Sequence, residues 1–171
     1  VRCAYLTDGI LSGFSLTNGF SRGGIDSPSN FGPEEVDGTG GGACMSGGVL
    51  SHCVVSGNVA EHGGGVYGGT LQHCIIQENS ARNGGGTYNS ALNHCILINN
   101  SVEPEQYYSD FLHGRGGGAH GGTLNNCMLT ANTAWKGGGA YGSTLTQCTI
   151  VSNSADSNGS GVDESTLDNC I

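Results

Sequence analysis

The sequence predicts an all-β fold, a right-handed parallel β-helix of about seven coils of about 21 residues with two loop insertions. Three observations predict this solenoid: a fixed repeat period, short β-prone segments and clusters of glycine. The period is set by cysteines, which recur 21 residues apart from Cys53 to Cys74 and from Cys74 to Cys95. A repeat of this length indicates a solenoid, in which each unit packs on its neighbours.

Each unit has the pattern of Gly63–Asn79, GGGVYGGTLQHCIIQEN. Its short apolar segments favour strands, whereas three adjacent glycines would each cost a helix about 1 kcal/mol. We therefore expect three short strands and three turns in each coil. The same pattern begins again, with small changes, at Gly40, Gly84, Gly116 and Gly137.

The chain is expected to form one domain over residues 1–171, either a piece of a longer chain or one unit of a polymer. Two segments interrupt the period, at residues 20–39 and 101–115, and both come after the asparagine that recurs in each coil. Insertions in repeat proteins map to one face, which is often the binding face. The two insert loops are therefore the clearest indication of where a partner binds.

The composition limits the classes of partner and location. The net charge is −9 and the isoelectric point about 4.8, which argues against nucleic acid or an anionic membrane as partner. Only 11% of the residues are charged, so Ser, Thr, Asn and Gly dominate the surface. No apolar segment is long enough for membrane insertion. This composition favours a secreted or cell-surface protein that meets a polar polymer.

Stacked coils, about 4.8 Å apart, would place equivalent residues above one another as ladders. The asparagine ladder is predicted to be structural, with side-chain amides that bond to one another and to turns. The cysteine ladder has two interpretations, buried free thiols or disulfides between coils. Cys3 and Cys44 lie outside it and are unassigned. The asparagines are Asn58, Asn79, Asn100, Asn132 and Asn153. The cysteines are Cys53, Cys74, Cys95, Cys127, Cys148 and Cys170.

Charged and aromatic residues gather at the turn edge and in the insert loops, where a polysaccharide could bind. The predicted binding residues are Trp135, Tyr107, Tyr108, Arg82, Arg115, Lys136, Glu34, Glu35 and Asp110. Charged residues also collect in loops without any function. No catalytic residue, metal site or cofactor is assigned, with Ca²⁺ at the loop acids as an alternative.

Two columns of rings allow a functional and a structural interpretation. The column of Tyr67, Tyr88, His120 and Tyr141 is either a stacked aromatic surface for sugar rings or a set of residues that favour strands. The column of His52, His73 and His94 has the imidazoles that transition metals prefer. It continues as Asn and Gln in later coils, so we interpret it as a polar ladder at a bend.

The repeats also resemble those of a known family. GGGVY, GGGTY, GGGAH and GGGAY resemble the GGA[ILV] motif of polymorphic outer-membrane proteins, which are autotransporter passengers. VSGN, IQEN, LINN, LTAN and IVSN resemble its FxxN partner motif, with an aliphatic residue in place of Phe. The resemblance implies a secreted or surface-exposed bacterial right-handed parallel β-helix. Proteins of this broad group include adhesins as well as polysaccharide lyases and hydrolases.

The sequence thus favours a structural or adhesive module that presents the loop-bearing edge to a glycan or a protein surface. The exposed ends of the helix would allow end-to-end association into a homopolymeric fibre. The alternative is a polysaccharide lyase or glycoside hydrolase fragment that uses the acids of the insert loops.

Overall fold

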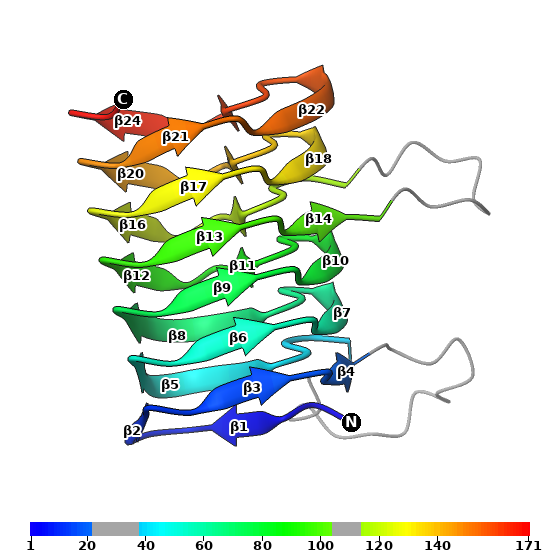
Figure 1. Cartoon of the computed structure of the whole chain (residues 1–171), viewed down its shortest axis with the longest axis vertical. Helices are drawn as coiled ribbons and strands as arrows, with labels where there is room; N and C mark the ends of the chain where they lie inside the picture. Colours follow the sequence, from blue (N-terminus) through cyan, green and yellow to red (C-terminus); the bar gives the residue numbers. More distant parts are fainter. Residues whose placement is uncertain (22–37, 104–113) are drawn as a thin grey trace.

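The computed structural model describes residues 1–21, 38–103 and 114–171, and in these residues it is all-β, with no helix. Short strands pair in parallel, and successive coils stack along one axis into a solenoid-like array (Figure 1). Strands of equivalent position form columns along this axis. No helix in the described part of the chain is long and apolar enough to cross a membrane.

The strands form four columns, of which the first two share a twelve-stranded sheet. Column one contains β1 (Ala4–Leu6), β5 (Ala43–Ser51), β8 (Val66–Gln72), β11 (Thr87–Tyr88), β15 (Ala119–His120), β19 (Ala140–Tyr141) and β23 (Val162–Asp163). Column two contains β2 (Ile10–Ser12), β12 (Ala91–Asn93), β16 (Thr123–Asn125), β20 (Thr144–Thr146) and β24 (Thr166–Asp168). The long strands β5 and β8 pass through both columns.

The other two columns are six-stranded parallel sheets. Column three contains β3 (Ser15–Thr17), β6 (Val54–Ser56), β9 (Ile75–Gln77), β13 (Ile96–Ile98), β17 (Met128–Thr130) and β21 (Thr149–Val151). Column four contains β4 (Phe20–Ser21), β7 (Val59–His62), β10 (Ser80–Asn83), β14 (Ser101–Val102), β18 (Thr133–Lys136) and β22 (Ser154–Asn158).

Column four differs from the expectation of three strands in each coil. Its strands occupy the segment predicted to be a turn, and β4 and β14 lie inside the predicted insert loops 20–39 and 101–115. The strands form there because the small residues that alternate along them, such as Ala81, pack inward while their neighbours face outward. The first residues of both predicted insert loops, up to Ser21 and Glu103, therefore belong to the described coils.

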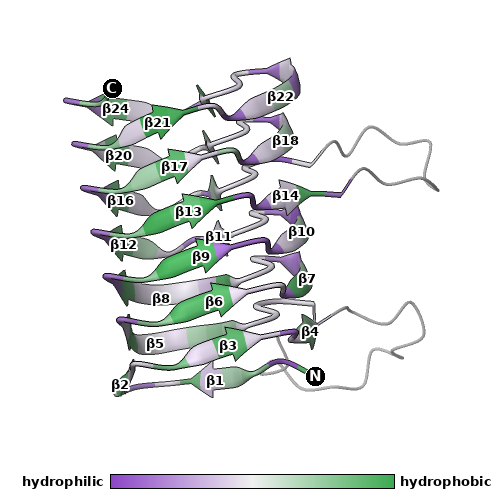
Figure 2. Ribbon diagram, in the orientation of Figure 1, coloured by the Kyte–Doolittle hydropathy of each residue, from purple (hydrophilic) through white to green (hydrophobic). Residues whose placement is uncertain are grey.

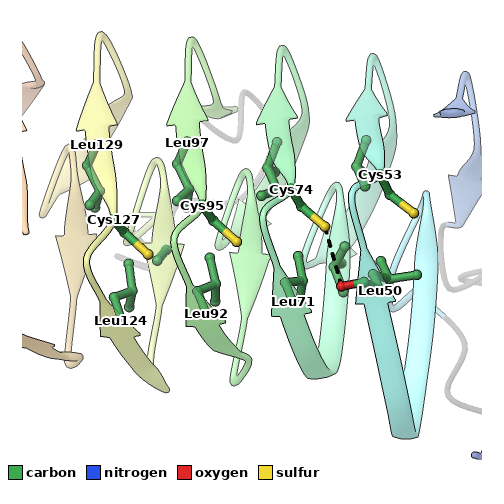
Figure 3. Close-up of a cluster of buried hydrophobic side chains, with 14 of the residues drawn as sticks. Leu50, Cys53, Leu71, Cys74, Leu92, Cys95, Leu97, Leu124, Cys127 and Leu129 are labelled. Carbon is green, nitrogen blue, oxygen red and sulfur yellow. Dashed lines mark hydrogen bonds between the residues drawn. The ribbon is translucent and has the colours of Figure 1, made fainter. Parts of the chain in front are cut away.

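The stacking is in phase, so equivalent residues lie next to each other. Leu92 pairs with Leu71 on one side and with Leu124 on the other. These leucines and the ladder cysteines form the buried core, as Figure 3 shows for the central coils. Figure 2 shows strong hydrophobic colouring on β6, β9 and β13 of column three. The outward residues Ile75 and Met128 of this column are exposed.

Residues in the left-handed backbone region turn the chain between columns. In one coil they are His73 (φ 53°), Glu78 (φ 55°), Gly84 (φ 64°) and Asn89 (φ 51°). Each tight bend needs a residue that tolerates a positive φ, a conformation that favours Gly and Asn over β-branched residues. The bends recur at equivalent positions in other coils, which keeps the coils in register.

Candidate functional site

The asparagine ladder forms a continuous buried chain of hydrogen bonds. Asn79 donates from its backbone N–H (3.1 Å) and from Nδ2 (3.0 Å) to Oδ1 of Asn100. Asn100 donates in turn from Nδ2 to the carbonyl of Ile76 (2.9 Å) and to Oδ1 of Asn132 (3.0 Å). These side chains are fully buried and their polar groups are paired with one another. They hold the bend between columns three and four and offer nothing to a ligand.

The cysteine ladder consists of free thiols. Cys74 donates from Sγ to the carbonyl of Leu50 in the preceding coil (3.4 Å; Figure 3). Cys148 donates in the same way to the carbonyl of Leu124 (3.4 Å). Hydrogen bonding to Cys95 and burial raise the pKa of Cys74. In-phase parallel neighbours point their side chains the same way, which fits a disulfide poorly. Of the unassigned pair, Cys3 is exposed and Cys44 is buried.

We expect thiol reactivity to follow this burial. Iodoacetamide should modify Cys3 first and the half-buried Cys170 more slowly, while the six buried thiols react only after unfolding. Peptide mass spectrometry of the native and the urea-unfolded protein measures the order. A native protein that shows no free thiols at the ladder positions, but regains them with a reductant, would establish disulfides instead.

The structure places only part of the predicted binding set. Glu34, Glu35, Tyr107, Tyr108 and Asp110 lie outside the described residues, and so do the acids invoked for Ca²⁺ or for glycan cleavage, apart from Glu103. The remaining four residues are brought to one edge, at column four and the bend that follows it. Arg82 lies on β10, Trp135 and Lys136 lie on β18, and Arg115 pairs with Lys136 in an isolated bridge.

A column of stacked rings lies across the glycine bend from this edge. The centroid distances are 5.4 Å from Tyr67 to Tyr88, 4.7 Å from Tyr88 to His120 and 5.2 Å from His120 to Tyr141. The first two pairs are nearly parallel, with interplanar angles of 6°. The rings of these two pairs therefore cover one another's faces, while His120 and Tyr141 are tilted by 30°. The column thus does not present the open stacking surface for sugar rings that the sequence suggested. The edges of Tyr67, Tyr88 and His120, which are half-buried, remain for contacts, whereas Tyr141 is buried.

Two residues from the edge pack against these rings. The His62 ring lies 5.1 Å from the Tyr88 ring at an angle of 52°, and the Arg115 guanidinium lies 4.8 Å above the Tyr141 ring. A cation above an aromatic face is attracted by the ring quadrupole. We call the four stacked rings, His62 and Arg115 together the ring-edge site.

The imidazoles of the ring-edge site have buried nitrogen atoms without a partner. Nδ1 of His62 and Nδ1 of His120 are both buried and make no hydrogen bond. Burial lowers the pKa of His62, and Arg82 lowers it further while Glu61 opposes this. Burial and Arg115 likewise lower the pKa of His120. Both rings are therefore neutral at neutral pH, and each can accept or donate a hydrogen bond.

The second imidazole column has a different geometry. His52, His73 and His94 are exposed and stack with centroids 5.0 and 5.1 Å apart, each at a bend with positive φ. Parallel rings point their nitrogen atoms side by side rather than toward one ion. In the described ranges, no group of three or more His, Cys, Asp or Glu side chains could hold a metal ion.

Sequence reasoning did not pair His62 or Arg115 with the rings, because each contacts a ring of the following coil. The signal was available in the period, since both residues immediately precede a glycine triplet. No protein-family model matches the sequence, and comparisons with curated proteins and with solved structures find no significant match. The function must therefore be inferred from the site itself.

Proposed function

We propose that this chain is a right-handed parallel β-helix that serves as a structural and adhesive module of a secreted or cell-surface protein. In this proposal it binds a glycan along the ring-edge site and does not cleave it. Parallel strands joined by crossovers are right-handed in almost all proteins, which supports the handedness. The polar, sparsely charged composition supports an extracellular location.

The observation that carries the proposal is the regular spacing of the ring edges. Successive rings are 4.7–5.4 Å apart, which is similar to the length that one sugar adds to an extended chain. A glycan that lies along the stacking axis would thus meet a hydroxyl or an imidazole edge at the half-buried Tyr67, Tyr88 and His120. Such groups bond well to sugar hydroxyls because they both donate and accept.

The positions of the two sequence insertions support the same edge. β4 lies at the start of one predicted insert loop and β14 at the start of the other, and these strands belong to the same six-stranded sheet, with β7 and β10 between them. Trp135 and Lys136 lie on β18, the next strand of that sheet. A ligand along the ring-edge site would therefore lie near the sheet in which both sequence insertions begin, as expected where insertions mark the binding face of a repeat protein.

The test is the dependence of affinity on glycan length. Isothermal titration with oligosaccharides of increasing length should show an affinity that rises roughly two- to tenfold per added sugar, until the rings are covered. Tyr88→Ala should remove most of this gain, whereas Tyr5→Ala, the same change on an exposed tyrosine outside the stacked rings, should not. An affinity independent of length, or equally sensitive to both variants, would refute the site. Binding only to a protein partner would refute the proposal that the ligand is a glycan.

A further inference from the structure

We propose that the glycan is acidic, and that Arg115 with His62 and His120 binds its carboxylate or sulfate groups. This inference rests on the proposed function and adds the chemical class of the ligand. It is carried by three observations on the ring-edge site: a local gathering of cations, the exposed guanidinium of Arg115, and two half-buried imidazoles around one tyrosine.

The cations are concentrated where the rest of the protein is acidic. The chain has a net charge of −9 and only five Lys and Arg residues, yet Arg82, Arg115 and Lys136 share this edge. The guanidinium of Arg115 is held over Tyr141, and the side chain is exposed. Arginine in such a position can bond a carboxylate or sulfate through two parallel N–H groups.

The imidazoles provide hydrogen bonds at the same place. The rings of His62 and His120 lie 5.1 Å and 4.7 Å from the Tyr88 ring, so both flank one tyrosine. In each ring Nδ1 is buried without a hydrogen-bond partner, out of reach of an external ligand, so the glycan would contact the accessible remainder of the half-buried ring. An anionic oxygen would accept a hydrogen bond from either imidazole.

The charges around the two histidines are mixed, and they define where an anion fits. Glu61 raises the pKa of His62 and Arg82 lowers it, whereas Arg115 and His62 both lower the pKa of His120. Acids lie at the far end of the column, where Glu164 hydrogen-bonds Tyr141 and raises its pKa. The anion is therefore expected on the Tyr88 side of Arg115, away from Glu164.

Proton linkage gives the proposal a distinctive signature. In the free protein, burial and the arginines lower the pKa of both histidines, so they bind few protons at neutral pH. A bound anion favours the imidazolium and raises both pKa values. Binding then takes up protons, and the affinity for an acidic glycan increases as the pH falls below about 6.5. A neutral glycan would show no such increase.

The experiment compares three oligosaccharides of equal length by titration calorimetry at about pH 5 to 8. They are an oligomannuronate, its carboxyl methyl ester and a neutral glucan. The oligomannuronate should bind at least roughly tenfold more tightly than the other two, with proton uptake. Arg115→Gln should weaken the binding of the oligomannuronate about tenfold. Arg2→Gln, which removes a positive charge in the first coil, should leave it unchanged.

His120→Tyr separates the role of the imidazole from a structural role. Tyrosine occupies this position in three other coils, so the variant keeps the ring stack and should fold normally. It should retain glycan binding with a reduced pH dependence. Equal binding of ester and acid, or tight binding of the neutral glucan alone, overturns the acidic ligand but preserves the proposed function. Binding of none of the three overturns both.

Discussion

Replacing Gly85 with alanine is expected to lower the free energy of unfolding by at least about 4 kcal/mol. Gly85 is the middle residue of a triplet that lies directly against column four. A Cβ atom there would overlap the carbonyl oxygen of Ser101 and lie 2.6 Å from that of Gly117. These are backbone atoms held by the stacked coils, so no side-chain movement relieves the overlap. Urea unfolding followed by circular dichroism measures the change.

Gly142→Ala is the matched control for this substitution. Gly142 has a positive φ of 60°, and its added Cβ would meet nothing within 4 Å. Its cost is the backbone strain alone, about 1 kcal/mol. Similar losses for the two variants would contradict the backbone overlap as the reason for glycine at position 85.

Asn100→Ala is expected to cost on the order of 3 kcal/mol in the same measurement. The change removes the acceptor of the Asn79 backbone N–H and the side-chain donor to the Ile76 carbonyl, in a position with no solvent access. It also breaks the chain of amide bonds between Asn79 and Asn132. Because these groups are buried, water cannot replace the lost partners.

The adjacent Asn99 offers an unusually close control. It is exposed with φ 54°, and the equivalent position in the next coil is Ala131, also at φ 54°. Alanine is thus accommodated at this bend, and Asn99→Ala should cost no more than about 1 kcal/mol. Equal destabilisation by the two variants would contradict a structural role specific to the buried ladder.

The repeat made the interior of each coil predictable. Leu92 and its equivalents recur at a constant offset from the cysteines, and the structure stacks them in phase as buried residues. Column four was not predictable in the same way. Its segment Ser80–Asn83 is polar and short, and its tendency to form a strand depends on Ala81 packing inside and on parallel pairing with β7 and β14.

The candidate site was only partly predictable for a related reason. The sequence indicated that Arg82, Arg115, Trp135 and Lys136 share an edge, because they lie at two adjacent positions of the repeat near the end of a coil. It also indicated the ring column. It did not indicate that the rings would stack face to face, since this depends on side-chain rotation and not on the period.

The sequence by itself determined the period, the in-phase stacking and the identity of the buried ladders, because parallel pairing of like coils needs only regular spacing. The tertiary structure decided which side chains meet across the glycine bend, such as His62 with Tyr88 and Arg115 with Tyr141. That meeting depends on the angle of the bend. The angle follows from left-handed residues such as Gly84 and from the close approach of Gly85 to column four, which are properties of the packed backbone.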